Sequence, residues 1–132
     1  MSRGGIGFEG IGLQQATFKA GAGIKALVAA ANRDAVVGLP VVISAAQTVD
    51  LGVSGATVFG FIDVYENDGH VGVSFRGFVT DVPIGAVAPT VGKIAATDGA
   101  GAVISSAETA KLRCPVVVEV DATAETCTVF LG

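Results

Sequence analysis

Five side chains are of types that could support catalysis or metal binding: His70, Ser74, Asp63, Cys114 and Cys127. A hydrolytic triad needs a histidine close to a serine or cysteine and to an acid, and His70 is the single histidine. It follows a turn signal, where a histidine is ordinarily solvated, and a serine within a strand is usually inert. A zinc site from His70 and the two cysteines lacks paired ligand spacing. We therefore predict no catalytic residue, no metal and no cofactor.

Two glycine patterns resemble phosphate-binding motifs but lack the surroundings that those motifs need. Residues 5–10 match G-x-G-x-x-G, which holds a pyrophosphate only between a strand and a helix N-terminus. Four residues precede this motif, and no βαβ pattern follows it. Gly92-Lys93 is similar to the end of a P-loop, but Ile94 stands where a serine or threonine would bind magnesium. Neither pattern predicts a nucleotide site.

Composition favours one domain that is poor in charge. The chain has 132 residues, 51% of them hydrophobic and 15% charged, with a net charge of −4. It has no Lys/Arg run for nucleic-acid phosphates, no apolar run near the ~20 residues of a membrane helix, and no signal-peptide core. We predict reduced, buried cysteines. A surface so poor in charge is readily explained if a partner covers it, although scattered small residues are an ordinary alternative.

The strongest structural signal is residues 58–79, in which two apolar runs flank Glu66-Asn67-Asp68-Gly69. Asp-Gly between alternating runs predicts a hairpin, because glycine adopts a positive φ without strain. Alternate residues of a strand lie on opposite faces. In the first strand one face consists of Val58, Gly60, Ile62 and Val64, and the opposite face of Phe59, Phe61, Asp63 and Tyr65. In the second strand one face consists of Val71, Val73, Phe75, Gly77 and Val79, and the opposite face of His70, Gly72, Ser74, Arg76 and Phe78. One apolar and one mixed face are typical of the middle of a small sandwich or barrel. The acidic group Asp63, Glu66 and Asp68 could attract a cation weakly, but we favour a solvated turn.

Short strands separated by glycine and proline are predicted along the rest of the chain, at residues 14–18, 41–43, 48–51, 91–96 and 102–104. Residues 24–31 are ambiguous, since their alanines favour a helix whereas their length and the following turn favour a strand. We prefer a strand there, because Val36-Val37 follows the turn closely.

A closing hairpin is predicted from residues 115–120 and 126–131, with Asp121 opposite Thr126 and a four-residue turn between them. In this register the apolar side consists of Val116, Val118 and Val120 against Leu131, Val129 and Cys127. Cys114 then lies beyond the end of the partner strand, which again favours free thiols.

The domain organisation that we predict is an N-terminal arm, residues 1–13, and a single β domain, residues 14–132. The arm is rich in glycine, which is costly to order, yet it carries Ile6, Phe8, Ile11 and Leu13. Mobile tails seldom need large apolar side chains. These residues either dock on a partner or cover an edge of their own domain.

From residue 58 onward the chain resembles the small decoration (cement) proteins of tailed-phage heads. The resemblance rests on the VFGFIDVYENDGHVGVSFRGFV hairpin, the Gly/Pro loop at 83–89, Val91-Gly92-Lys93, the DGAGAV turn at 98–103 and the valine-rich closing hairpin. It covers about two thirds of the chain, through glycine and valine spacings. It implies an all-β, small sandwich or barrel-like (β-tulip-like) domain with a flexible arm.

Membership of that family would imply a structural virion protein and no enzyme. Such a protein binds the outer surface of the assembled head, commonly as a homotrimer, and clamps neighbouring major capsid protein subunits. It would be made in the host cytoplasm and would bind neither nucleic acid nor membrane. The candidate contacts are Phe8, Ile11, Leu13 and Phe18 near the N-terminus, and Phe59, Phe61 and Phe78, for which the core of the domain is the alternative. The alternative functions are a virion appendage that binds a host glycan and, with His70 as its single plausible group, a small β-barrel enzyme.

Overall fold

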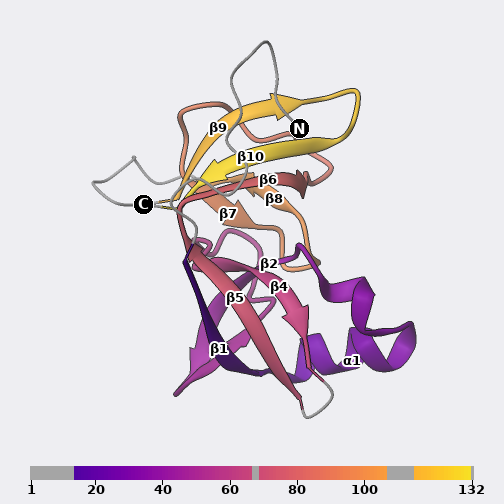
Figure 1. Cartoon of the computed structure of the whole chain (residues 1–132). Coiled ribbons are helices and arrows are strands. Elements are labelled where there is room, and N and C mark those ends of the chain that lie inside the picture. The colour runs from indigo at the N-terminus through magenta and orange to yellow at the C-terminus, as the bar shows by residue number, and fades with distance from the viewer. Residues whose placement is uncertain (1–13, 67–68, 107–114, 132) are drawn as a thin grey trace.

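A computed structural model describes residues 14–66, 69–106 and 115–131. Strands make up 51% of the structure and one α-helix accompanies them, which agrees with the predicted all-β class. The strands form a closed barrel below two smaller sheets (Figure 1). The barrel strands are β1 (Gln14–Ala20), β2 (Pro40–Ala45), β3 (Thr48–Asp50), β4 (Gly60–Tyr65) and β5 (His70–Arg76), in the order β1-β3-β2-β4-β5. A three-stranded sheet has the order β6 (Phe78–Pro83), β10 (Thr126–Phe130) and β9 (Val116–Asp121), and β7 (Ala95–Thr97) pairs with β8 (Val103–Ser105). No helix in these ranges is long and apolar enough to cross a bilayer.

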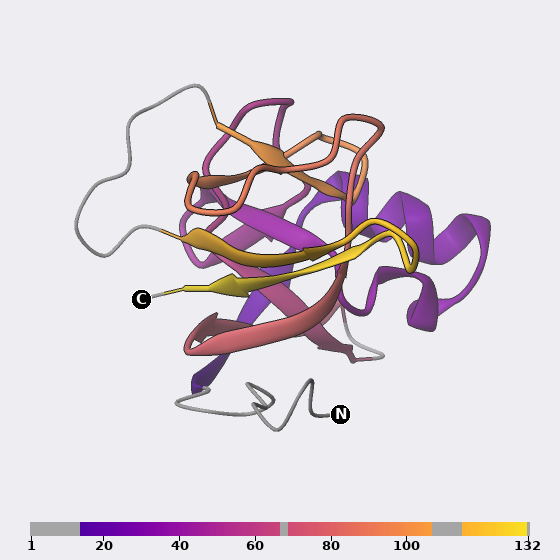
Figure 2. The same ribbon diagram turned by 90° about the horizontal axis from the view of Figure 1, so that it is seen from above.

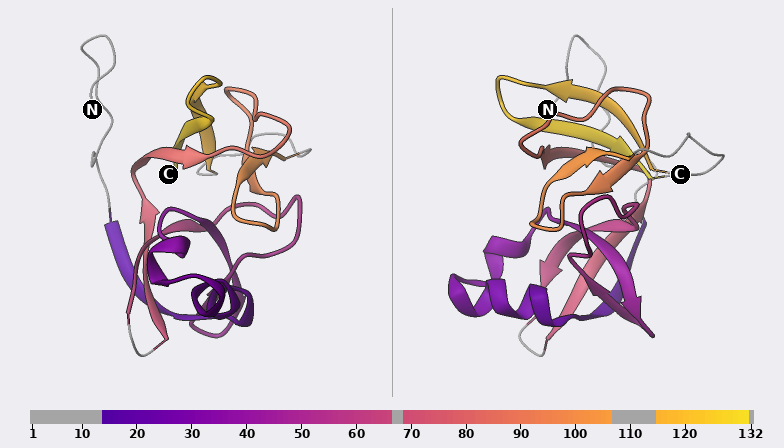
Figure 3. Two further views of the ribbon diagram at one scale, coloured as in Figure 1. Left: turned by 90° about the vertical axis from the view of Figure 1, so that its right-hand side faces the viewer. Right: turned by 180° about the vertical axis from the view of Figure 1, so that it is seen from behind.

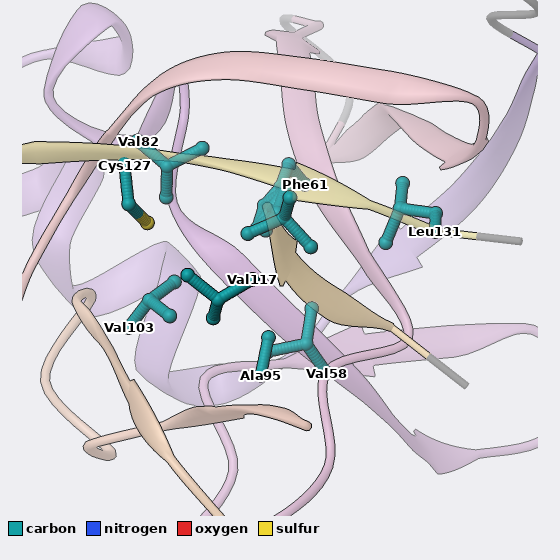
Figure 4. Close-up of a cluster of buried hydrophobic side chains, with 9 residues drawn as sticks. Val58, Phe61, Val82, Ala95, Val103, Val117, Cys127 and Leu131 are labelled. Carbon is teal, nitrogen blue, oxygen red and sulfur yellow. The ribbon is translucent and has the colours of Figure 1, made fainter. Parts of the chain in front are cut away.

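Two hydrophobic clusters hold these layers together. The barrel cluster consists of Ala20, Ile24, Val36, Val41, Val49, Ile62, Val71 and Val73. The upper cluster lies between the two smaller sheets and the top of the barrel and consists of Val58, Phe61, Val82, Ala95, Val103, Val117, Cys127, Val129 and Leu131 (Figure 4). Adjacent residues of β4 serve both, because Ile62 points into the barrel and Phe61 into the upper cluster. Successive side chains of a strand point to opposite faces, so one strand joins the two clusters.

The central hairpin exists as β4 and β5, but its predicted faces are only partly correct. The pairing shifts between Ile62 and Val64, so Asp63 has no partner of its own across the hairpin. A bulge of this kind adds one residue and reverses the alternation beyond it. Val64, predicted to share the apolar face of Ile62, is consequently 46% exposed.

The predicted second strand also ends earlier than expected, at Gly77. Its φ of +90° bends the chain out of the barrel, and β6 continues in the three-stranded sheet (Figure 3). Residues 80–83 belong to β6, so Pro83, the first residue of the Gly/Pro loop named above, ends a strand. The stretch 58–79 therefore spans two sheets instead of forming one hairpin.

The strand preferred for residues 24–31 is wrong, because the chain forms the helix α1 (Ala22–Ala30). Gly21 at the N-cap supplies no side-chain acceptor. Instead the carboxylate of Asp50, at the end of β3, accepts hydrogen bonds from the amides of Gly23 (3.3 Å) and Ile24 (3.2 Å). An acceptor 26 residues away in sequence satisfies the helix start, so the local sequence carries no capping signal. The strand suggested at Val36-Val37 is likewise a short 3-10 helix, η1 (Arg33–Val36).

The closing hairpin is confirmed in its turn and in its register as far as Thr128, but the predicted register is wrong beyond that residue. Asp121 pairs with Thr126 around the predicted four-residue turn, and the Asp121 carboxylate accepts hydrogen bonds from the amides of Thr123 and Ala124. The pairing shifts between Thr128 and Val129. As a result Val117 is fully buried, whereas the predicted core residues Val116 and Val118 are half-buried. The turn at 98–101 is also confirmed; β7 before it is shorter than the predicted strand at 91–96, and β8 after it begins one residue later than the predicted strand at 102–104.

Candidate functional site

The candidate catalytic side chains among the described residues, His70, Ser74 and Asp63, do not converge. His70 and Ser74 lie four residues apart on β5, a separation of about 13 Å along a strand. Ser74 is buried, and its hydroxyl lies 3.5 Å from the side-chain nitrogen of Gln15, which donates to the Asp63 carboxylate at 2.9 Å. Asp63 and Ser74 are thus linked through Gln15 and not through His70, which excludes the arrangement that a triad requires.

The metal and cation hypotheses can be tested only in part. Among the described residues no three His, Cys, Asp or Glu side chains are close enough together to hold a metal ion. Cys114 and Asp68, which belong to the predicted groups, lie outside those residues. A shallow depression does lie beside His70, lined also by Thr17, Phe18, Lys19 and Gln47. It contains a single histidine and no carboxylate, so it has the donors of neither a triad nor a metal site.

Cys127 is a free thiol in the upper cluster, as predicted, and is 3% exposed. Burial raises the pKa of its thiol to about 12, because the charged thiolate is poorly solvated there. Since the thiolate is the reactive form of cysteine, Cys127 is inert near neutral pH and acts as a small core residue.

The predicted aromatic contacts occupy three different places. Phe61 is 1% exposed in the upper cluster, so the core alternative holds for it. Phe59 is half-buried, with its ring edge-on to Phe18 (5.5 Å between centroids) and stacked on Phe75 (6.1 Å). The other three predicted contacts, Phe8, Ile11 and Leu13, lie outside the described residues.

Phe78 is half-buried at the start of β6, in the three-stranded sheet. Its ring centroid lies 4.7 Å from that of Phe130, which is 37% exposed. This pair leaves aromatic surface on β6 and β10. Phe18, Phe59 and Phe78 therefore remain partly accessible, whereas Phe61 does not.

A more exposed apolar surface lies on loops that the sequence reasoning did not select. Val53, Val87 and Val91 are 74%, 77% and 57% exposed. Val87 lines a groove of about 410 Å³, and the other two each adjoin a residue that lines it. The rest of the groove is formed by Ser54, Ala86, Ala88, Thr90, Asp98, Ile104 and Ser105. We call these three valines and the groove the valine-loop surface.

Backbone hydrogen bonds tie these loops to the two-stranded sheet below them. Gly55 donates to the carbonyl of Thr97 at 2.9 Å, and Gly85 donates to that of Val103 at 2.9 Å. The amide of Thr90 donates to the hydroxyl of Ser105 at 2.7 Å. The exposed valines are therefore held on anchored loops, so a partner would find their positions largely pre-formed.

The sequence contained one usable signal for this surface. Val53 and Val87 stand in glycine- or proline-rich stretches outside the predicted strands, where an apolar side chain has no periodic reason to be present, whereas Val91 was predicted to begin a strand. Because the core also consists largely of valine, residue type alone does not distinguish these exposed valines from the buried ones. No protein-family model matches this chain, and neither a curated protein nor a solved structure is significantly similar to it.

Proposed function

We propose that this chain is a decoration protein of a tailed-phage head. It binds the outer surface of the assembled shell and cements neighbouring major capsid protein subunits. It is made in the host cytoplasm and acts on the virion, and it assembles as a homotrimer. The proposal starts from the resemblance of residues 58–132, which implies this role.

The observation that supports it best is the valine-loop surface. Val53, Val87 and Val91 are exposed apolar side chains, and a single carboxylate of the described residues, Asp98, lines the groove to which Val87 belongs. The central part of a protein–protein interface is poor in charged residues, and apolar groups that stay in water are disfavoured. A binding surface for protein explains these three exposed apolar side chains better than a catalytic or glycan-binding role does, because the described residues that line the groove include one charged side chain, Asp98, and no aromatic ring.

Because many copies of a decoration protein bind one shell, each copy needs only an interface of modest size to stabilise the shell. One complex of ordinary size buries about 1,600 Å² in total, and a trimer that contacts several capsid subunits adds its contacts by multivalency. Stabilisation of the shell then results from binding alone, since anything that binds only the assembled state favours that state.

The test is co-sedimentation of the purified protein with expanded heads of the phage that encodes it. We expect saturable binding at a fixed number of copies per head, and a band at 13.1 kDa in purified virions. The Val53→Ser, Val87→Ser double variant removes two apolar contacts of about 1.5 kcal/mol each, which corresponds to roughly a hundredfold weaker binding. Val64→Ser, which changes an exposed valine on β4, is the matched control and should bind like the parent.

Two outcomes would contradict this proposal. One is the absence of the chain from virions together with no binding to heads. The other, which refutes only the assigned surface, is a double variant that binds with parental affinity. Light scattering of the free and head-bound protein tests the trimer separately.

A further inference from the structure

The groove of the valine-loop surface holds a carboxylate among uncharged side chains. Asp98 directly follows β7 and lines the groove together with small, apolar and hydroxyl side chains from neighbouring loops and from β8. No lysine, arginine or histidine of the described residues lines it. Figure 2 shows β7 and β8, in orange, at one side of the molecule, separated from β6 by β9 and β10. The groove therefore lies on the far side of the three-stranded sheet from β6.

The two oxygens of the Asp98 carboxylate have different roles. Oδ1 accepts hydrogen bonds from the amides of Ala100 at 2.8 Å and Ala102 at 3.0 Å, which stabilise the turn at 98–101. Oδ2 accepts no hydrogen bond from the described residues, and Asp98 forms no ion pair with them. The side chain is half-buried. Its position is thus fixed by the turn, while one of its oxygens is left for a partner.

Gly85 keeps space beside this second oxygen. A β-carbon at Gly85 would lie 3.6 Å from Oδ2 and 2.7 Å from the Cγ2 methyl group of Ile104. Gly85 precedes Ala86 and Val87, which line the same groove. Oδ2 therefore lies close to the loop that carries the exposed Val87, so a partner that contacts Val87 is within reach of the carboxylate.

A partner that covers this groove has to compensate the charge that it buries. A carboxylate taken out of water without a counter-ion is costly, whereas a hydrogen-bonded cation offsets much of that loss. The apolar part of the groove favours an aliphatic side chain. The net charge of −4 on the whole chain favours the approach of a cationic surface. These considerations select one chemistry, an aliphatic side chain beside a positive charge.

We propose that the partner segment at the valine-loop surface presents a lysine or arginine to Oδ2 of Asp98 and places an aliphatic side chain next to it in the groove. The identity of that partner, a major capsid protein subunit, rests on the proposed function. The inference adds the chemistry that the subunit has to supply. A neutral or acidic segment would leave the carboxylate unpaired and would bind more weakly.

This chemistry can be tested without heads, by three probes that share one aliphatic side chain. At about pH 6.5 leucinamide is cationic, N-acetylleucinamide is neutral and N-acetylleucine is anionic. NMR titration of the labelled full-length chain should show leucinamide binding with a dissociation constant on the order of 10 mM. The neutral probe should bind about fivefold more weakly, and the anionic probe more weakly still. The amides of Ala100 and Ala102, which donate to Asp98, should shift together with that of Val87.

A charge-removing variant tests whether Asp98 causes the preference. Asp98→Ser removes the charge and keeps an acceptor for the turn, and it should bind leucinamide and the neutral probe equally. Asp121→Ser is the matched control, because Asp121 also accepts from two amides of its own turn but does not line the groove. In the parent, equal or undetectable binding of the three probes, or a preference for the anionic one, would overturn the proposal. That comparison needs no variant.

Head binding tests the assignment to the capsid. In co-sedimentation with expanded heads, Asp98→Ser should bind at least about tenfold more weakly than the parent and depend less on salt, whereas Asp121→Ser should bind like the parent. Parental affinity of Asp98→Ser would overturn the proposal. Self-association of the free protein that Asp98→Ser abolishes would overturn it in favour of a second copy of this chain. A parent that does not bind heads would refute the proposed function, and the three probes would still decide the chemistry of the groove.

Discussion

Substitution of Gly21 by alanine should destabilise the protein through Asp50 and not through the backbone of Gly21. Gly21 has φ −76° and ψ 175°, which alanine adopts freely. A β-carbon at this position would lie 2.5 Å from the Asp50 carboxylate and 2.7 Å from its β-carbon. The carboxylate would have to move, and the amides of Gly23 and Ile24 would lose their acceptor.

The magnitude follows from these hydrogen bonds. Loss of a helix N-cap costs about 1 kcal/mol, and hydrogen bonds to a charged group contribute about 1.5–3 kcal/mol. Because Asp50 is half-buried, we expect Asp50→Ala to cost about 2 kcal/mol. Gly21→Ala should cost about 3 kcal/mol, which is the same loss plus about 1 kcal/mol of crowding.

The two changes together should cost about 3 kcal/mol instead of about 5, because the same hydrogen bonds are lost only once. The residual crowding between the two β-carbons is present in both variants that carry the Gly21→Ala change, so it cancels in the cycle. Urea unfolding followed by circular dichroism measures all four free energies of unfolding. Asn32→Ala, which removes the exposed cap of η1, is the control and should add independently. A double variant whose cost equals the sum of the singles within about 0.5 kcal/mol would refute this account of the helix start.

Three further predictions concern the core. Phe61→Ala should cost about 3–5 kcal/mol in urea unfolding, because it opens a cavity in the upper cluster, whereas Phe130→Ala, at a partly exposed ring, should cost well under half of that. Thr97→Val should lower the free energy of unfolding by about 1–3 kcal/mol, since the buried hydroxyl donates to the Leu51 carbonyl and accepts from the Gly99 amide. An unchanged free energy of unfolding would show that these two hydrogen bonds do not contribute to stability. The raised pKa of Cys127, about 12, means that the unfolded chain loses this proton first as pH rises. Its contribution to stability is therefore complete below about pH 9 and declines between there and pH 12 by at most about 1.4 kcal/mol per pH unit. Cys127→Ala should lack this slope when unfolding is measured from about pH 8 to 10.

The sequence predicted the turns well because their causes are local. The register of Asp121 with Thr126 and the turn at 98–101 depend on residues within a few positions of each other. The helix α1 could not be predicted in the same way, since its capping carboxylate comes from Asp50, on a strand that packs beside it only after folding. The alanines of this stretch do favour a helix, but the sequence near Gly21 shows no side-chain cap that would have decided between helix and strand.

The face assignments failed where one extra residue enters a strand. The bulges at Asp63 and near Thr128 each reverse the alternation of inward and outward residues beyond them. As a result Val64 is exposed and Val117 is buried in the core. Each face was assigned on the assumption of strict period two. A valine-rich strand does not show where that period breaks, because the residues on both faces are of the same type.

The abundance of valine also explains why the sequence did not reveal the valine-loop surface. The position of this surface on the fold affects how the protein would bind a partner. Val53 and Val87 lie on loops held by backbone hydrogen bonds from Gly55 and Gly85 to the two-stranded sheet, whose Ala95 and Val103 are fully buried in the upper cluster. Deformation of these loops would disturb the core beneath them. Little ordering of the loops should then be needed on binding, which removes one of the main costs of association. If this is correct, a core substitution such as Phe61→Ala should weaken head binding as well as stability, whereas Val64→Ser should change neither.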